Sequence, residues 1–363
     1  MAPTAQRRVG RRQQRRNVEV RIRVAAAVAA LLLLAALVVA IRFTGQGLPS
    51  GVPPGTSGAA APVSAGGPAA ADFTGIADWE NSPPLTMASL RGRVVLVDFW
   101  TYSCINCQRT FPFLRQWWQR YHADGLVIVG VHSPEFDFEK NVDNVRRAIR
   151  EYDIQWPVAV DSSMATWNAY ANQYWPAEYL VDATGRVRHT SFGEGEYDVT
   201  ERAIQTLLGE AGHRVGGAIV SADPGLTKDA STETPETYVG SDRSDGSVKL
   251  QGSWEQRPAF AQLTATGAAG GDYAELPYQS RRVYIVAAPA AGPVTVRVTL
   301  DGRDLQPAQA GSSIHFDAAG HSYAVVDHDD LYPLVSLPGF DRHVLRVSPQ
   351  QGGFQLYTFT FGS

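Results

Sequence analysis

Hydrophobic and polar positions follow different patterns in four parts of the 363-residue chain, and each pattern predicts a different structure. Residues 24–41 are eighteen uninterrupted apolar residues. As a helix they extend about 27 Å, close to the roughly 30 Å hydrocarbon core of a bilayer. In residues 42–71, 24 of thirty positions are Gly, Ala, Pro, Ser or Thr. We therefore predict a single transmembrane helix at 24–41, followed by a flexible linker.

The third part, residues 72–215, alternates buried-strand and helix patterns. Residues 94–100 (VVLVDFW) are a near-continuous apolar run, which is typical of a strand buried on both faces of a sheet. Strands are predicted at 94–100, 126–131, 178–182 and 187–191, and helices at 107–122, 142–152, 165–172 and 199–208. The last two strands flank the turn 183–186 and predict a hairpin. This alternation predicts an α/β layer fold.

The fourth part, residues 249–363, follows a second polar linker predicted at 216–248. It contains short β segments separated by Gly, Pro and Asp turns, without helical periodicity. Strands are predicted at 281–287, 294–300, 322–326, 331–337, 343–347 and 354–361. Regular strands without helices predict an all-β sandwich or jelly roll.

Charge is divided unequally along the chain. Residues 1–23 hold eight arginines and one acidic residue, whereas the chain from residue 72 onward carries 23 basic and 35 acidic residues. The acidic body excludes a nucleic-acid binder. The basic leader predicts a cytoplasmic N-terminus and a body outside the cytoplasm. The alternative is a signal peptide that is cleaved, which would release the body as a secreted protein.

Only two cysteines occur, Cys104 and Cys107, and their spacing predicts redox chemistry. They follow a predicted strand and begin a predicted helix, where backbone N–H groups stabilise a thiolate. Cys104 can attack a disulfide, and Cys107 can resolve the mixed disulfide that forms. A structural disulfide closing so short a loop adds only about 2 kcal/mol. Two cysteines also exclude a four-thiolate zinc site.

Residues 97–107 (VDFWTYSCINC) resemble the active-site stretch of thioredoxins. The resemblance implies that Asp98 assists proton transfer for the resolving thiol, and that Pro112 lies in the active-site helix. Residues 174–182 (YWPAEYLVD) resemble the cis-proline region, which implies that Pro176 and the Trp175 backbone bind substrate. We expect Trp100 and Tyr102, which flank the thiols, to shape the substrate groove. Glu194 and Glu196 are expected to be a solvated charge pair in a turn.

The region 126–172 resembles the insertion of extracytoplasmic thioredoxin-like proteins of the TlpA and ResA kind, and the sequence from residue 72 onward resembles the soluble part of DipZ-like proteins. This implies a thioredoxin fold with a TlpA-like insertion, followed by a β module that looks carbohydrate-binding. It also implies a redox-active disulfide, Cys104–Cys107, with no other cofactor and no metal. Peroxide reduction is disfavoured because Val97 stands where peroxiredoxins place a proline.

The function that these patterns favour is a membrane-tethered, extracytoplasmic thiol–disulfide oxidoreductase. Its expected partners are disulfide-containing envelope proteins such as apocytochrome c, and a separate multi-span electron donor of the CcdA or DsbD kind, because this chain has one apolar span. A glycan is a further expected ligand of the β module. The alternative is a glycan- or protein-binding envelope protein with a vestigial redox domain. The direction of exchange stays open because Ile105 and Asn106, between the cysteines, favour neither direction.

Overall fold

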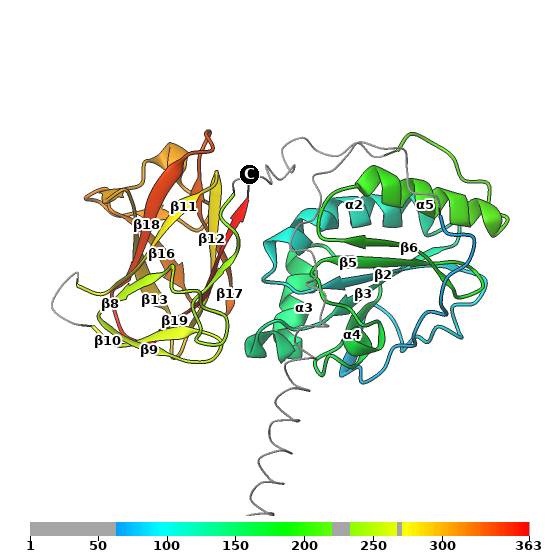
Figure 1. Ribbon diagram of the computed structural model, residues 1–363, viewed down its shortest axis with the longest axis horizontal. Helices are drawn as coiled ribbons and strands as arrows, with labels where there is room; N and C mark the ends of the chain where they lie inside the picture. Colours follow the sequence, from blue (N-terminus) through cyan, green and yellow to red (C-terminus); the bar gives the residue numbers. More distant parts are fainter. Residues whose placement is uncertain (1–62, 220–232, 267–270, 363) are drawn as a thin grey trace, which may run out of the picture. The chain divides into compact units, whose positions relative to one another are not determined.

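The computed structural model describes residues 63–219, 233–266 and 271–362, and Figure 1 shows them as an α/β region and an all-β region. The predicted membrane helix and most of the first linker lie outside these residues. Within the described ranges, no helix is long and apolar enough to cross a membrane.

The α/β region is built on one six-stranded sheet in the order β1-β4-β3-β2-β5-β6. Strands β2, β3 and β4 are parallel, whereas β1, β5 and β6 run antiparallel to their neighbours. The strands are β1 (Asp78–Glu80), β2 (Val94–Trp100), β3 (Leu126–His132), β4 (Val158–Val160), β5 (Ala177–Val181) and β6 (Val187–Phe192). The helices are α2 (Ile105–Tyr121), η1 (Asp137–Lys140), α3 (Val142–Glu151), α4 (Ala165–Ala169) and α5 (Tyr197–Glu210).

Strand β2 lies inside this sheet and is buried at every position, as its apolar run predicts. Alternate residues point to opposite faces of a strand. Leu96 and Trp100 belong to one core together with residues of α2, α3 and α5. Val97 and Phe99 belong to a second core with Trp167 of α4. Asp98 has the parity of Leu96 and Trp100, so its side chain lies on the α2 face.

The all-β region consists of two antiparallel sheets that share one hydrophobic core, which is a β-sandwich. One sheet has the order β17-β12-β19-β10-β9, with β7 paired to β19. The other has the order β15-β16-β13-β18-β11-β8, with β14 paired to β13. The strands are β7 (Thr237–Tyr238), β8 (Lys249–Gln251), β9 (Ser253–Gln256), β10 (Ala261–Ala265), β11 (Tyr273–Gln279), β12 (Arg282–Pro289), β13 (Val294–Leu300), β14 (Arg303–Asp304), β15 (His315–Phe316), β16 (Ser322–Val326), β17 (Asp330–Ser336), β18 (Arg342–Pro349) and β19 (Phe354–Gly362).

The observed elements differ from the sequence prediction mainly where segments are short or polar. Helix α4 is shorter than the predicted 165–172. Eight strands outside the predicted linker were not predicted: β1, β4, β8, β9, β10, β11, β14 and β15. Strand β7 lies inside the predicted linker 216–248, where Thr237 and Tyr238 pair with Phe359 and Thr358 of β19. Part of this linker therefore belongs to the sandwich.

Candidate active site

Strand β2 ends four residues before Cys104, which is the N-cap of α2. The Cys104 backbone is extended, with φ −88° and ψ 109°, and the Cys107 N–H donates a hydrogen bond to Cys104 Sγ at 3.2 Å. Both cysteines are free thiols, Cys104 half-buried and Cys107 fully buried. This arrangement presents Cys104 as the attacking thiol and keeps Cys107 behind it.

Burial dominates the electrostatics of both thiols. It raises the pKa of Cys104, while hydrogen bonds from Cys107 oppose this shift. It also raises the pKa of Cys107 well above its usual value, and Asp98 adds to this shift. The helix-terminus argument alone favoured a lowered Cys104 pKa. The desolvation of the thiolate outweighs that effect here.

Asp98 is a fully buried carboxyl in the apolar layer between β2 and α2. Neither of its carboxyl oxygens has a hydrogen-bond partner among the described residues. Burial raises its pKa well above the usual value, and Glu178 raises it further. An acid held in this way keeps its proton to a higher pH than an exposed aspartate does, so it is suited to exchange a proton with a thiol, whose pKa is also high.

Glu178 lies directly opposite Asp98 in the antiparallel register of β2 and β5. It is only 5% exposed, and burial raises its pKa to about 7. Glu178 is not among the site residues predicted from the sequence. The signal that was available is an acid within the otherwise apolar run EYLV, the same kind of exception that marks Asp98 in VVLVDFW.

The Trp175–Pro176 peptide bond is cis, as the resemblance implied. The Pro176 carbonyl accepts a hydrogen bond from the Gly193 N–H at 2.9 Å. Trp175 is half-buried, and its Nε1–H donates to the Ser133 carbonyl at 3.0 Å. Two exposed aromatic rings, Tyr174 and Phe192, lie 5.3 Å apart between centroids beside this loop. The cis-proline loop therefore has an apolar surface next to it.

Trp100 and Tyr102 do not line a groove, because both side chains are completely buried. The Trp100 ring packs edge-on against Phe111 and His132. Tyr102 stacks on the His132 ring, at 5.7 Å between ring centroids. Their expected role in substrate contact is wrong for this conformation. Both residues instead support the segment that carries the cysteines.

Two further acids near the site were misjudged or missed. Glu194 is not solvated: it forms an ion pair with Arg109 of α2 at 3.1 Å, and both side chains are almost fully buried. Glu139 of η1 is completely buried, and burial raises its pKa to about 7. It accepts hydrogen bonds from the Ser103 hydroxyl at 2.6 Å and from the Glu135 and Phe136 N–H groups. Glu139 thus ties the residue before Cys104 to the loop after β3.

The sheet, the two thiols at the start of a helix and the cis-proline loop define a thioredoxin-like thiol–disulfide oxidoreductase. Comparison with known proteins agrees. Residues 67–190 match the model of the AhpC/TSA family, and residues 223–362 match that of the thioredoxin-like C-terminal domain. The thiol–disulfide oxidoreductase YkuV of Bacillus subtilis is 30% identical over 139 residues, which cover 38% of this chain and 93% of YkuV. The chain belongs to the thioredoxin-like thiol–disulfide oxidoreductases.

A longer match extends over both regions. Protein DipZ of Mycobacterium tuberculosis and of Mycobacterium bovis is 38% identical over 318 residues, which cover 81% of this chain. The chain spans 43% of the length of these DipZ proteins. A solved structure of a thioredoxin-like protein in the oxidized form is 31% identical, with a TM-score of 0.37, and the match covers 39% of this chain and 95% of that one.

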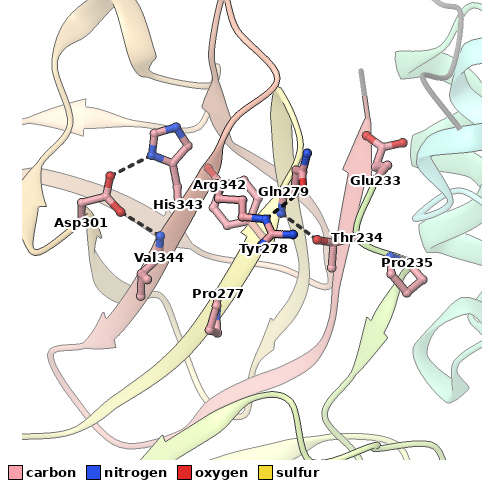
Figure 2. Close-up of a pocket in the computed structure, with 10 residues that line it drawn as sticks. All are labelled: Glu233, Thr234, Pro235, Pro277, Tyr278, Gln279, Asp301, Arg342, His343 and Val344. Carbon is pink, nitrogen blue, oxygen red and sulfur yellow. Dashed lines mark hydrogen bonds and ion pairs between the residues drawn. The ribbon is translucent and has the colours of Figure 1, made fainter. Parts of the chain in front are cut away.

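The β-sandwich contains a pocket of its own, with a volume of about 510 Å³, between β11, the start of β18 and residues 233–235 (Figure 2). Asp301 pairs with His343 Nδ1 at 2.8 Å and accepts from the Val344 N–H at 2.9 Å. Arg342 Nε donates to Gln279 Oε1 at 3.1 Å. The buried Tyr278 hydroxyl has no hydrogen-bond partner among the described residues. The pocket therefore offers several polar groups to a ligand.

Proposed function

We propose that this chain is a membrane-tethered, extracytoplasmic reductant of protein disulfides, with envelope proteins such as apocytochrome c as substrates. The observation that carries the direction is Asp98, a buried carboxyl without a hydrogen-bond partner among the described residues, which is near enough to Cys107 to raise the pKa of that thiol. A group of this kind is suited to take the proton of a buried resolving thiol. The arginine-rich leader and the apolar run 24–41 support the membrane topology.

The proposed reaction has two exchange steps. The Cys104 thiolate attacks one sulfur of the substrate disulfide, and the other sulfur leaves as a thiolate that takes a proton from solvent. Cys107 then gives its proton to the ionised Asp98 and attacks Cys104 Sγ, which releases the second substrate sulfur as a thiolate that takes a proton from solvent, and Asp98 returns its proton to solvent. The substrate gains two electrons and two protons, and the Cys104–Cys107 pair becomes a disulfide.

Each turnover leaves the pair oxidised, so the function needs a source of electrons. We propose that a separate multi-span membrane protein of the CcdA or DsbD kind returns the pair to the dithiol by the reverse exchange. In the substrate step, the cis-proline loop with Trp175 and Pro176 would align the target segment beside Cys104. The exposed rings of Tyr174 and Phe192 would contact its apolar side chains.

The test uses the reduced full-length chain in detergent and an oxidised peptide that contains the haem-attachment pattern Cys-x-x-Cys-His. We expect the peptide to become a dithiol while one disulfide forms per chain, as measured by thiol alkylation and mass spectrometry. A Cys104→Ser chain is the matched control. A peptide that stays oxidised with the wild-type chain, but is reduced by dithiothreitol, would contradict the proposal and favour a vestigial redox domain.

A second candidate function, glycan binding by the β-sandwich, is favoured by its pocket. Sugar hydroxyls pair well with side chains of the Arg342, His343, Asp301 and Tyr278 kinds, which can donate or accept hydrogen bonds. We expect Arg342→Ala and Tyr278→Phe to weaken the binding of a cell-wall oligosaccharide, such as a tetramer of N-acetylglucosamine, by about tenfold each in calorimetry. Tyr323→Phe, outside the pocket, is the control. Equal binding by all the chains, or no binding by any, would rule out a glycan of this kind as the ligand of the pocket.

A further inference from the structure

We infer that Glu178 is a positioning residue for the resolution step: the opposed carboxyls of Asp98 and Glu178 hold one proton between them, and Thr200 links Glu178 to the half-buried His189. This inference rests on the thiol–disulfide function proposed above and adds a residue to it. Glu178 acts through Asp98, so it does not itself touch the reacting sulfur atoms.

The two carboxyls lie opposite each other on one face of the sheet. Asp98 and Glu178 are direct partners across β2 and β5, so their side chains leave the same face of the sheet. Opposed residues of this kind have Cβ atoms about 4.5–5.5 Å apart. Their neighbours on this face, Leu96 and Leu180, belong to the apolar core that also contains Cys107. The two acids therefore form an isolated polar pair in an apolar layer.

The carboxyl pair cannot hold two negative charges. Asp98 is completely buried and Glu178 is 5% exposed. Two ionised carboxylates in such a site repel each other while both lack solvation, so one of the two keeps a proton at neutral pH. A proton that moves between Glu178 and Asp98 leaves the total charge of the pair unchanged. The proton received from Cys107 can therefore be passed on without creating a second buried charge.

A set of hydrogen-bonding groups leads away from Glu178, whereas neither Asp98 oxygen has a hydrogen-bond partner among the described residues. The Thr200 side chain of α5 hydrogen-bonds to Glu178 and favours its ionised form, which identifies the hydroxyl as the donor. His189 Nε2 of β6 lies 3.3 Å from Thr200 Oγ1. Thr200 is 1% exposed, whereas His189 is half-buried. The order Cys107, Asp98, Glu178, Thr200, His189 thus runs from the buried thiol toward the edge strand β6.

The titratable groups around the pair come from each element packed against it. They are Cys107 on α2, Tyr197 on α5 and His189 on β6. Burial raises the pKa of Tyr197, and burial lowers the pKa of His189. Both groups are therefore neutral between pH 7 and pH 9 on their usual values. In this pH range, a change in the exchange rate with pH therefore reflects the titration of the two carboxyls and the thiols.

The alternative is that Glu178 is only structural, and its chemistry argues against this. A glutamine has the same length and accepts the same Thr200 hydrogen bond, without the cost of a buried acid. Burial raises the pKa of Glu178 to about 7, which means that the ionised form opposes folding. Retaining an acid at this cost is explained if its proton is used.

The test follows both exchange steps in one experiment. The reduced full-length chain is mixed with an aromatic disulfide whose thiolate absorbs light, 5,5′-dithiobis(2-nitrobenzoate). The attack by Cys104 releases the first aromatic thiolate, and resolution by Cys107 releases the second. Stopped-flow absorbance therefore gives two phases, and each phase is measured from pH 5 to pH 9.

For Glu178→Gln we expect an unchanged first phase and a second phase slowed by about tenfold at pH 7. We also expect the pH midpoint of the second phase to fall, because Asp98 loses a like-charged neighbour and its pKa decreases. Asp143→Asn, at an 84% exposed side chain on α3, should leave both phases and the midpoint unchanged. A second phase of wild-type rate and midpoint in Glu178→Gln overturns the inference. Equal slowing of both phases, with an unchanged midpoint, also overturns it, since that indicates a structural effect.

His189→Ala tests the outer end of the route and does not alter the carboxyl pair. Its second phase should be slower than that of the wild type, and added imidazole should restore it. If Glu178→Gln does not fold, His189→Ala is the test of the route. A second phase that is not slowed, or that is slowed but not restored by imidazole, contradicts the route. If the wild-type chain itself releases only one aromatic thiolate, the proposed redox function fails as well. If the wild-type chain shows two phases and Glu178→Gln shows the same rates and midpoint, this inference fails but the proposed redox function does not.

Discussion

Cys107→Ser should accumulate a stable mixed disulfide between Cys104 and the substrate, whereas Cys104→Ser should form none. Cys104 is the N-cap of α2 and is half-exposed, so its sulfur can reach an incoming disulfide. Cys107 is completely buried and cannot make the first attack. We expect the rate of disulfide reduction to fall by at least about a thousandfold in either variant, because the two thiols act as one unit. The adduct is read from non-reducing gels and from the mass of the intact chain.

A second pair of variants separates chemistry from folding in this experiment. Cys107→Ala should trap the same adduct as Cys107→Ser, since only the resolving sulfur matters. Ser103→Ala removes the hydroxyl that donates to Glu139 and leaves both sulfur atoms in place, so its product should be fully resolved. Failure of both Cys107 variants to trap the oxidised peptide would contradict a catalytic role for the pair. That result would favour the alternative, a glycan- or protein-binding envelope protein with a vestigial redox domain.

Asp98→Asn should slow turnover and stabilise the fold, and the stabilisation should grow with pH. Burial raises the pKa of Asp98, so between the unfolded and folded pKa values the unfolded chain is ionised while the folded chain keeps its proton. The stability of the wild type therefore falls as pH rises through that window. Asparagine does not titrate and removes this slope. Its advantage should reach about 1–3 kcal/mol on the alkaline side, the usual penalty for a buried group without a partner.

Although Asp98→Asn should stabilise the fold, it should slow the reaction. Without a base beside Cys107, the resolution step should slow by about a hundredfold at pH 7, while attack by Cys104 stays close to the wild-type rate. Asp143→Asn, at a side chain that is 84% exposed, is the matched control and should change neither quantity. Urea unfolding at several pH values and the two-phase disulfide assay measure the two effects. A variant that resolves at the wild-type rate would remove Asp98 from the mechanism.

The sequence pattern predicted several long apolar strands, and it missed the seven-residue β11 (Tyr273–Gln279), in which Glu275 and Pro277 interrupt the apolar pattern. Strand β2 coincides with the predicted 94–100, and β13 and β16 coincide with 294–300 and 322–326. Strands β1 and β4 have three residues each, which is too short for a period of two to be recognised. The two-residue strand β7 (Thr237–Tyr238) has no apolar pattern, and only its pairing with β19 identifies it as a strand.

For the candidate site, the sequence identified the thiols, the buried aspartate and the cis-proline loop, whose catalytic roles stay predictions. The burial of Trp100 was accessible from alternation, because Trp100 shares the parity of Leu96 and must face α2. Glu178 was less accessible. It is eighty residues from Asp98 in the chain, and only the register of β2 and β5 places the two side chains opposite each other.

The most direct test of the central claim is the reduction potential of the Cys104–Cys107 pair in the full-length chain. It is measured by equilibration in buffers of defined glutathione ratio, with alkylation of the remaining thiols. A chain that reduces envelope disulfides should have a potential near that of thioredoxin, about −270 mV. A potential near about −120 mV, the value of a strong oxidant, would contradict the proposed direction of exchange.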